Sequence, residues 1–132
     1  MPELPDVEVF KRYIDSTSLH HRITQVKAPA PKVLSDLSAG RLASEVSGHS
    51  FTSSRRWGKH LFLKLDDGQW LAWHFGMTSY PRYCRRDNEN GGDDARFDAV
   101  RFYFDNGYLL AFNSRRKLGR IRLVDDPESF AR

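Results

Sequence analysis

The sequence has a single cysteine and no long apolar run. Cys84 stands alone among 132 residues, which excludes an internal disulfide and any zinc site built from several cysteines of this chain. Charged residues interrupt every apolar stretch well before the roughly 18 residues that a membrane-spanning helix requires. The first ten residues are acidic and lack the apolar segment of a secretory signal peptide. These absences predict a soluble intracellular protein, and residues 1–132 are expected to form one domain.

Apolar and aromatic residues are plentiful in comparison, at 39% and 13% of the chain, and they exclude a disordered polypeptide. A domain of this length buries about two thirds of the surface of its unfolded chain, which is enough for a hydrophobic core. The formal net charge is +4, and it is unevenly distributed, since residues 113–124 hold five basic side chains and no acidic one. A clustered positive charge favours nucleic acid as a partner, but many basic domains bind none. Composition alone therefore leaves both interpretations open.

Periodic apolar residues predict two short helices in the first third of the chain. At residues 5–16 apolar side chains recur at helical spacing after a proline suited to the first helical position. Residues 33–40 are predicted as the second helix, ended by Gly40. Between them, residues 23–26 are predicted as a strand that ends before a proline-rich break.

From about residue 49 the apolar period becomes two, which is typical of β-strands. Asp67-Gly68 and Asn106-Gly107 each predict the tight turn of a β-hairpin. The polar, glycine-rich residues 85–96 between the hairpins are predicted to form a mobile loop. The expected fold class is mainly β with flanking α, as an antiparallel two-sheet β-sandwich or a partly open barrel with an N-terminal helix and one further short helix.

The first residues of the chain could carry chemistry. Removal of Met1, which is usual before a small residue, would leave Pro2 as the N-terminus. The secondary amine of a terminal proline can attack an electrophilic carbon and form an iminium ion. Glu3 could donate or accept a proton at the same carbon. The plainer alternative is that Pro2 and Pro5 only stiffen the start of the helix.

Four motifs together resemble the bacterial formamidopyrimidine-DNA glycosylase and endonuclease VIII family. They are MPELPDVE at residues 1–8, RRWGKHL at 55–61, HFGMT at 74–78 and SRRKLG at 114–119. These are similar to the family's MPELPEVE start, its RR-x-GK-x-L segment, its HLGM(S/T) turn and its DPRRFG loop. Order and spacing agree as well, so the resemblance extends over nearly the whole chain.

The resemblance implies a base-excision-repair DNA glycosylase with AP-lyase activity that removes oxidised bases from damaged double-stranded DNA. Pro2 would be the nucleophile that forms a Schiff base with the damaged nucleotide. Glu3 would be the general acid that helps to open the sugar, and Lys59 would contact phosphate and assist β-elimination. The protein would be an intracellular, DNA-associated monomer, in the cytoplasm or nucleoid if bacterial.

Other residues would hold the DNA while the damaged base leaves the stack. Met77 would fill the gap left by the flipped base, Arg116 would face the orphaned base on the other strand, and Leu118 would act as an apolar wedge. Phosphate contacts position a duplex without reading its sequence. The side chains that would make them are Arg55, Arg56, Lys117 and Arg120.

Several residues depart from the family pattern. Asp6 replaces a glutamate, Ser114-Arg115 replaces Asp-Pro, and Leu118 replaces a phenylalanine wedge. Phe97 occupies the position of a DNA-contacting histidine, which predicts weaker binding of phosphate. These differences affect the expected choice of lesion and opposite base more than the expected chemistry.

The resemblance covers only the catalytic N-terminal domain of the family. The family's helix–two-turn–helix and zinc-finger modules have no counterpart here, so no cofactor is expected in this chain. Two origins stay open, a truncated protein or gene fragment and a naturally single-domain protein. An alternative function also stays open, a catalytically inactive or incomplete DNA-binding module of the same fold, because a retained Met1 would turn the Pro2 nitrogen into an amide. A third interpretation is a protein-interaction domain that reuses the sandwich.

Overall fold

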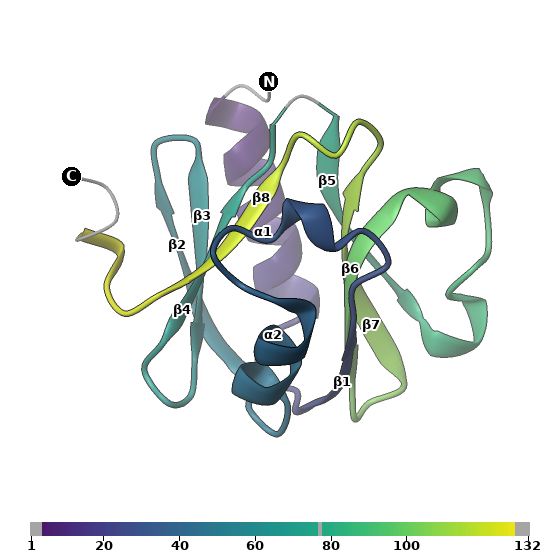
Figure 1. Ribbon diagram of the computed structural model, residues 1–132, viewed down its shortest axis with the longest axis horizontal. Helices are drawn as coiled ribbons and strands as arrows, with labels where there is room; N and C mark the ends of the chain where they lie inside the picture. Colours follow the sequence, from purple (N-terminus) through teal and green to yellow (C-terminus); the bar gives the residue numbers. More distant parts are fainter. Residues whose placement is uncertain (1–3, 77, 129–132) are drawn as a thin grey trace.

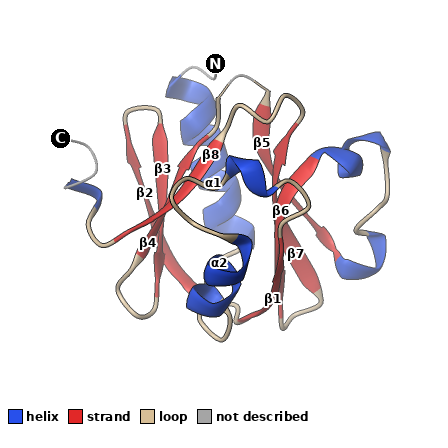
Figure 2. Cartoon of the chain, viewed as in Figure 1, coloured by secondary structure: helices blue, strands red, loops and turns tan. Residues whose placement is uncertain are grey.

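Two four-stranded antiparallel sheets form the framework of the computed structural model, which describes residues 4–76 and 78–128. The described elements, in chain order, are α1 (Leu4–Thr17), β1 (Ile23–Lys27), η1 (Pro31–Val33), α2 (Ala39–Val46), β2 (Phe51–Trp57), β3 (His60–Leu65), β4 (Trp70–His74), β5 (Ser79–Arg85), η2 (Arg86–Asn88), η3 (Asp93–Phe97), β6 (Asp98–Phe104), β7 (Tyr108–Ser114) and β8 (Arg120–Val124). One sheet has the strand order β1-β6-β7-β5 and the other the order β2-β3-β4-β8. Figure 1 shows α2 in front of the space between the sheets and α1 behind it. Figure 2 shows that strands are the main secondary structure of the fold. The predicted fold class, a mainly β two-sheet sandwich with two flanking helices, is confirmed.

The core lies between the two sheets, because alternate strand residues point inward. Leu61 and Leu63 of β3 are fully buried on this inner face, as their spacing predicts. The Trp73 ring packs against Phe102 and Phe112 of the opposite sheet, at centroid separations of 6.0 and 5.2 Å. The inner faces of the two sheets therefore share one apolar core.

Both predicted hairpin turns are present. Gly68 joins β3 to β4 at a φ of +94°, and Gly107 joins β6 to β7 at a φ of +84°. Glycine adopts this left-handed region at little cost, which explains why Asp-Gly and Asn-Gly are such informative turn sequences.

Helix α1 extends one residue beyond its predicted limits at each end and closes the open side between β2 and β5. Two polar contacts fix it to β2. The Ser54 hydroxyl donates to Asp15, and the Arg56 guanidinium lies 3.1 Å from the Glu8 carboxylate. The Glu8 contact holds the first half of the helix near the end of β2, and the Asp15 contact holds its last turn to the middle of that strand. None of the helices within the described ranges is both long and apolar enough to cross a membrane.

The second helix is not where the sequence predicted it. Residues 31–33 form only the short turn η1, and α2 begins after Ser38, whose side-chain oxygen accepts a hydrogen bond from the Arg41 backbone N–H at 3.1 Å. Gly40 therefore lies in the first turn of α2 and does not end a helix. The N-cap at Ser38 satisfies a backbone donor that would otherwise lack a partner, and this outweighs the low helix propensity of one glycine.

Residues 85–96 contain regular structure that the sequence prediction missed. They form η2 and η3 on the outer side of the sheet that contains β6 and β7 (Figure 1). A buried carboxylate anchors the end of this segment. Asp98 is 2% exposed and accepts hydrogen bonds from Arg82 and Arg101, the latter at 2.8 Å.

Candidate nucleic-acid interface

Four chain segments meet at one end of the sandwich, the upper end in Figure 1. They are the start of α1, the β2–β3 turn, the β4–β5 turn and the β7–β8 loop. Antiparallel pairing aligns them, because His60 pairs with His74 across β3 and β4, and His74 with Arg120 across β4 and β8. Motifs that are far apart in the sequence therefore lie side by side in space.

Three predicted site residues lie outside the described residues. They are the proposed nucleophile Pro2, the proposed general acid Glu3 and the apolar Met77. Their roles stay predictions. The described segments next to these residues, the start of α1 and the β4–β5 turn, lie at this end of the sandwich (Figure 1).

Gly76 brings the β4–β5 turn against the β7–β8 loop. Its φ is +66°, and a Cβ placed on it would lie 2.9 Å from the backbone carbonyl carbon of Leu118 and 3.0 Å from the Gly119 nitrogen. Only glycine permits this approach, since both the φ and the contact with backbone atoms disfavour a side chain. A second contact joins the same segments, because the Arg116 backbone N–H donates to the Thr78 hydroxyl at 3.2 Å.

The β2–β3 turn carries Lys59 and follows an exposed aromatic residue. Gly58 supplies a φ of +61°, so the chain reverses directly before Lys59. Trp57 is 41% exposed, and the Arg55 guanidinium lies 5.3 Å from its ring centroid. Arg55 and Arg56 point to opposite faces of β2, and Arg56 is paired with Glu8 of α1. The two predicted phosphate contacts of this strand thus differ in orientation.

The β7–β8 loop combines charged and apolar side chains at its tip. Arg116 is exposed, and Leu118 is 46% exposed although it is apolar. An exposed leucine between basic residues has the composition expected of a segment that enters a nucleic-acid duplex. Asp6, in the first turn of α1, is exposed at the same end of the molecule.

Two of the predicted phosphate ligands in this loop contact the loop itself. The Lys117 ammonium donates to the Ser114 carbonyl at 2.6 Å, and the Arg120 guanidinium donates to the carbonyls of Lys117 and Gly119 at 3.0 and 2.7 Å. Burial lowers the pKa of Lys117, and the nearby Lys32 lowers it further. Lys117 has a φ of +57°, a conformation that these contacts stabilise. The loop is therefore held in shape by its own cations.

A histidine pair lies beside Lys59. The rings of His60 and His74 lie 4.9 Å apart, and they line a cavity of about 300 Å³ together with Arg120 and Arg122. Burial lowers the pKa of both histidines; His74 further lowers that of His60, and Lys59 and Arg120 further lower that of His74. The alternating pattern of β3 places His60 on the outer face of the sheet. The presence of the two arginines beside it follows only from the pairing of β4 with β8, which the sequence does not show.

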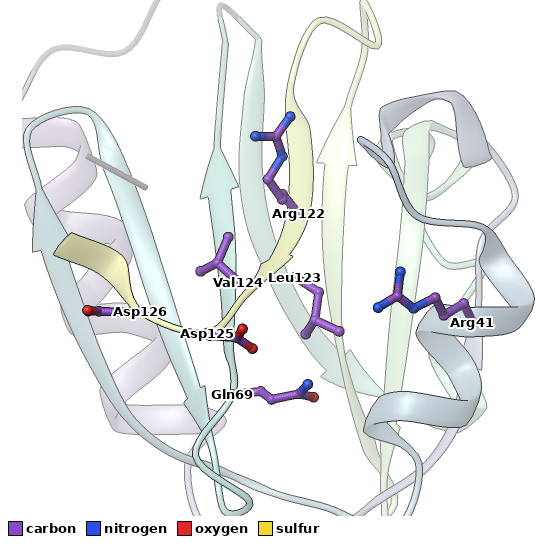
Figure 3. Close-up of a pocket in the computed structure, with 7 residues that line it drawn as sticks. All are labelled: Arg41, Gln69, Arg122, Leu123, Val124, Asp125 and Asp126. Carbon is purple, nitrogen blue, oxygen red and sulfur yellow. The ribbon is translucent and has the colours of Figure 1, made fainter. Parts of the chain in front are cut away.

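A larger cavity of about 530 Å³ lies away from these turns, beside the second half of β8 (Figure 3). Arg41 extends toward it from α2, and Gln69 lines it from the β3–β4 turn. The Gln69 side-chain oxygen is buried and has no hydrogen-bond partner among the described residues. No predicted site residue within the described ranges lines this cavity, so the candidate site is the end of the sandwich that carries the four segments.

The fold and the site define a small β-sandwich domain with one basic, apolar-tipped end, a surface suited to a polyanion such as a nucleic acid. The family model described as the formamidopyrimidine-DNA glycosylase N-terminal domain matches residues 1–121. The chain belongs to this family.

Curated relatives agree with this assignment. The chain is 30% identical to a formamidopyrimidine-DNA glycosylase of Arabidopsis thaliana, over 98% of this chain and 36% of that protein. It is 32% identical to one of Teredinibacter turnerae, over 99% of this chain and 47% of that protein. The chain thus spans less than half the length of these relatives.

The solved structures are similar in fold. A complex of the Lactococcus lactis Fpg protein with DNA that contains an abasic site superimposes with a TM-score of 0.86, at 22% identity, over 98% of this chain and 46% of that one. A complex of the same protein with DNA that contains Fapy-dG has a TM-score of 0.85.

Proposed function

We propose that this chain is the catalytic part of a base-excision-repair DNA glycosylase with AP-lyase activity. It removes oxidised bases from double-stranded DNA through a Schiff base at Pro2, and it acts as a DNA-associated monomer. The observation that carries the proposal is the convergence of four segments at one end of the sandwich, with Gly76 packed directly on the backbone of Leu118 and Gly119. Membership of the glycosylase family supplies the class of reaction.

The proposed reaction begins at the sugar of the damaged nucleotide. The Pro2 nitrogen forms a bond to C1′ while the bond from C1′ to the base breaks, and the base leaves with the bonding electrons and takes up a proton. Glu3 protonates the ring oxygen as the sugar opens, and the nitrogen lone pair forms the iminium. A proton is then lost from C2′ and the 3′ phosphate leaves, which cleaves the strand. Lys59 holds that phosphate, and water finally releases Pro2.

The adjacent turns explain how the base could be reached. The glycosidic carbon is inaccessible within the stack, so the nucleotide must leave the duplex. Met77 and Leu118 are apolar and occupy the two neighbouring segments, where they offset the lost stacking, while Arg116 faces the opposite strand. Lys117 and Arg120 add positive charge around this point, and Arg55 and Arg56 add it if their ion pairs with Glu128 and Glu8 open.

Borohydride trapping tests the proposal. Protein with a free Pro2, verified by intact mass, is incubated with an abasic-site duplex and sodium borohydride, which reduces an iminium to a stable amine. We expect a covalent protein–DNA adduct. A protein that retains an N-terminal extension is the matched control, because its Pro2 nitrogen is an amide while its fold is unchanged. If free Pro2 forms no adduct although the protein binds the duplex, the alternative function applies, a non-catalytic DNA-binding module.

A further inference from the structure

Three cationic side chains pack against the ring of Phe97. The Arg96 and Arg115 guanidinium carbons each lie 4.8 Å from the ring centroid, and the Lys117 ammonium lies 5.6 Å from it. Lys117 also lies 3.5 Å from the Phe97 carbonyl oxygen. Two of these cations belong to the β7–β8 loop and one to η3, so the ring joins two segments that are far apart in the sequence.

The backbone next to the Phe97 ring is anchored by hydrogen bonds to a buried carboxylate. Asp98 follows Phe97 directly, is buried, and accepts hydrogen bonds from Arg82, Arg101 and the Asn113 side chain, the last at 2.9 Å. The Asn113 amide also donates to the Asp94 carbonyl at 2.7 Å, which fixes η3 to β7. Phe97 is therefore presented by a rigid framework, and the cations that pack on it share that position.

Positive charge exceeds negative charge at this cluster. Asp94 lies 3.7 Å from Arg115, and it also accepts a hydrogen bond from the Tyr80 hydroxyl at 2.6 Å. One exposed carboxylate thus pairs with one of the three cations, and Asp98 is already balanced by Arg82 and Arg101. Three like charges held around one ring repel each other, and a bound anion would relieve that repulsion.

We propose that Arg96, Arg115 and Lys117, gathered on Phe97, form a binding site for a backbone phosphate of duplex DNA. The inference rests on the proposed function, which makes DNA the ligand. The cluster continues from Arg116 and Leu118 along the β7–β8 loop toward η3, so it extends the contact with DNA beyond the damaged nucleotide. The sequence comparison predicted that Phe97, in place of a histidine, would weaken phosphate binding. In this site Phe97 is instead a positioning residue that brings three other cations to the phosphate.

The test measures binding to a duplex that contains a tetrahydrofuran analogue of an abasic site, over a series of salt concentrations. Arg96→Gln and Arg115→Gln each remove one cation from the cluster. We expect each to weaken binding about threefold to fivefold at moderate salt and to reduce the log–log salt slope by at most about 0.9, the value for loss of the one phosphate that the cluster binds. Arg85→Gln is the matched control, since Arg85 is an exposed arginine at the opposite end of β5 from the site.

Phe97 variants separate the role of the aromatic ring from simple packing. Phe97→Leu keeps an apolar side chain but removes the π face, whereas Phe97→Trp keeps a stronger one. We expect Phe97→Leu to reduce affinity and salt slope, and Phe97→Trp to retain both. The proposal is overturned if Arg96→Gln and Arg115→Gln weaken binding no more than Arg85→Gln does, or if Phe97→Leu binds as the unmodified protein does. Borohydride trapping of the same proteins distinguishes the two claims. If an adduct forms but these variants do not change binding, the phosphate site alone is rejected. If the variants change binding but no adduct forms, the catalytic function alone is rejected.

Discussion

At the scale of single residues, the site brings two histidines together with positively charged side chains that disfavour their protonation. His60 and His74 line a cavity with Arg120 and Arg122, and Lys59 lies close enough to His74 to act on its charge. Burial and positive neighbours favour the neutral imidazoles, so the pKa of each histidine is lowered. This arrangement links the stability of the free protein to pH.

We predict that the folded protein loses stability as pH falls through the ordinary imidazole pKa of 6.5. Below that value the unfolded chain takes up protons that the folded protein binds only at a lower pH, so protonation favours unfolding. The His60→Gln, His74→Gln double variant removes both titrations. Its denaturation midpoint should change less between neutral and mildly acidic pH than that of the unmodified protein. Identical pH profiles would show that these histidines do not titrate as their surroundings imply.

Lys59 and Arg116 are predicted to differ in what they do. Lys59→Ala removes a phosphate contact and a proton-transfer group, so strand cleavage should fall by about 10²-fold. Arg116→Ala should weaken duplex binding and reduce the preference for the base opposite the lesion. On single-stranded abasic DNA there is no orphaned base, so Arg116→Ala should cleave the strand almost normally while Lys59→Ala does not. Equal losses on that substrate would assign Arg116 to a phosphate.

At the scale of elements, the contact between the β4–β5 turn and the β7–β8 loop is the most constrained feature of the site. Gly76→Ala would place a methyl group against backbone atoms of Leu118 and Gly119. Gly68→Ala is a matched control, because Gly68 also has a positive φ but has nothing within 4 Å of its missing Cβ. Gly68→Ala should lose about 1 kcal/mol of folding free energy from backbone strain, and Gly76→Ala should lose more because its methyl group also displaces backbone atoms.

Only Gly76→Ala should also reduce borohydride trapping, because it separates the two segments that hold the DNA. Urea denaturation and trapping on the same preparations measure the two effects. If Gly68→Ala reduces trapping equally, global stability and not the turn–loop contact controls activity.

A second prediction at this scale concerns the ionic anchor of η3. Asp98 is fully buried at its side chain, and Asp98→Asn would remove the carboxylate that Arg82 and Arg101 share and leave Arg101 only its longer pair with Glu89, at a cost of about 3 kcal/mol. Asp36→Asn is the control, since its pair with Arg122 is 88% and 42% exposed and should contribute under about 1 kcal/mol. Chemical denaturation of both variants tests the difference, and similar losses would contradict a buried anchor.

At the scale of the whole molecule, the local signals in the sequence were sufficient for most of the sandwich. Alternating leucines and the two glycine turns predicted the hairpins, and the spacing of apolar residues predicted α1 nearly to its ends. The prediction that Gly40 ends the second helix was wrong because the capping serine, and not the glycine, determines where α2 lies. The structure of residues 85–96 was not predicted from the sequence. It depends on Arg82 and Arg101, whose strands suggest partial exposure to solvent, and on their packing around Asp98, which is a long-range contact.

The site was predictable in its motifs but not in its internal contacts. The four motifs identified Lys59, Arg116 and Leu118, and the structure places their segments together. The pairing of Arg56 with Glu8 and the use of Arg120 to brace its own loop depend on tertiary geometry. So does the cation cluster on Phe97, since η3 and the β7–β8 loop meet only in the folded chain.

The central claim is that Pro2 attacks the damaged nucleotide at the end of the sandwich where the four segments meet. Peptide mapping of the borohydride adduct by mass spectrometry tests it most directly. After nuclease and protease digestion, the account predicts the sugar remnant on the N-terminal peptide, attached to the nitrogen of Pro2 in protein that lacks Met1. An adduct on Lys59 or another lysine, with Pro2 free and unmodified, would contradict the account.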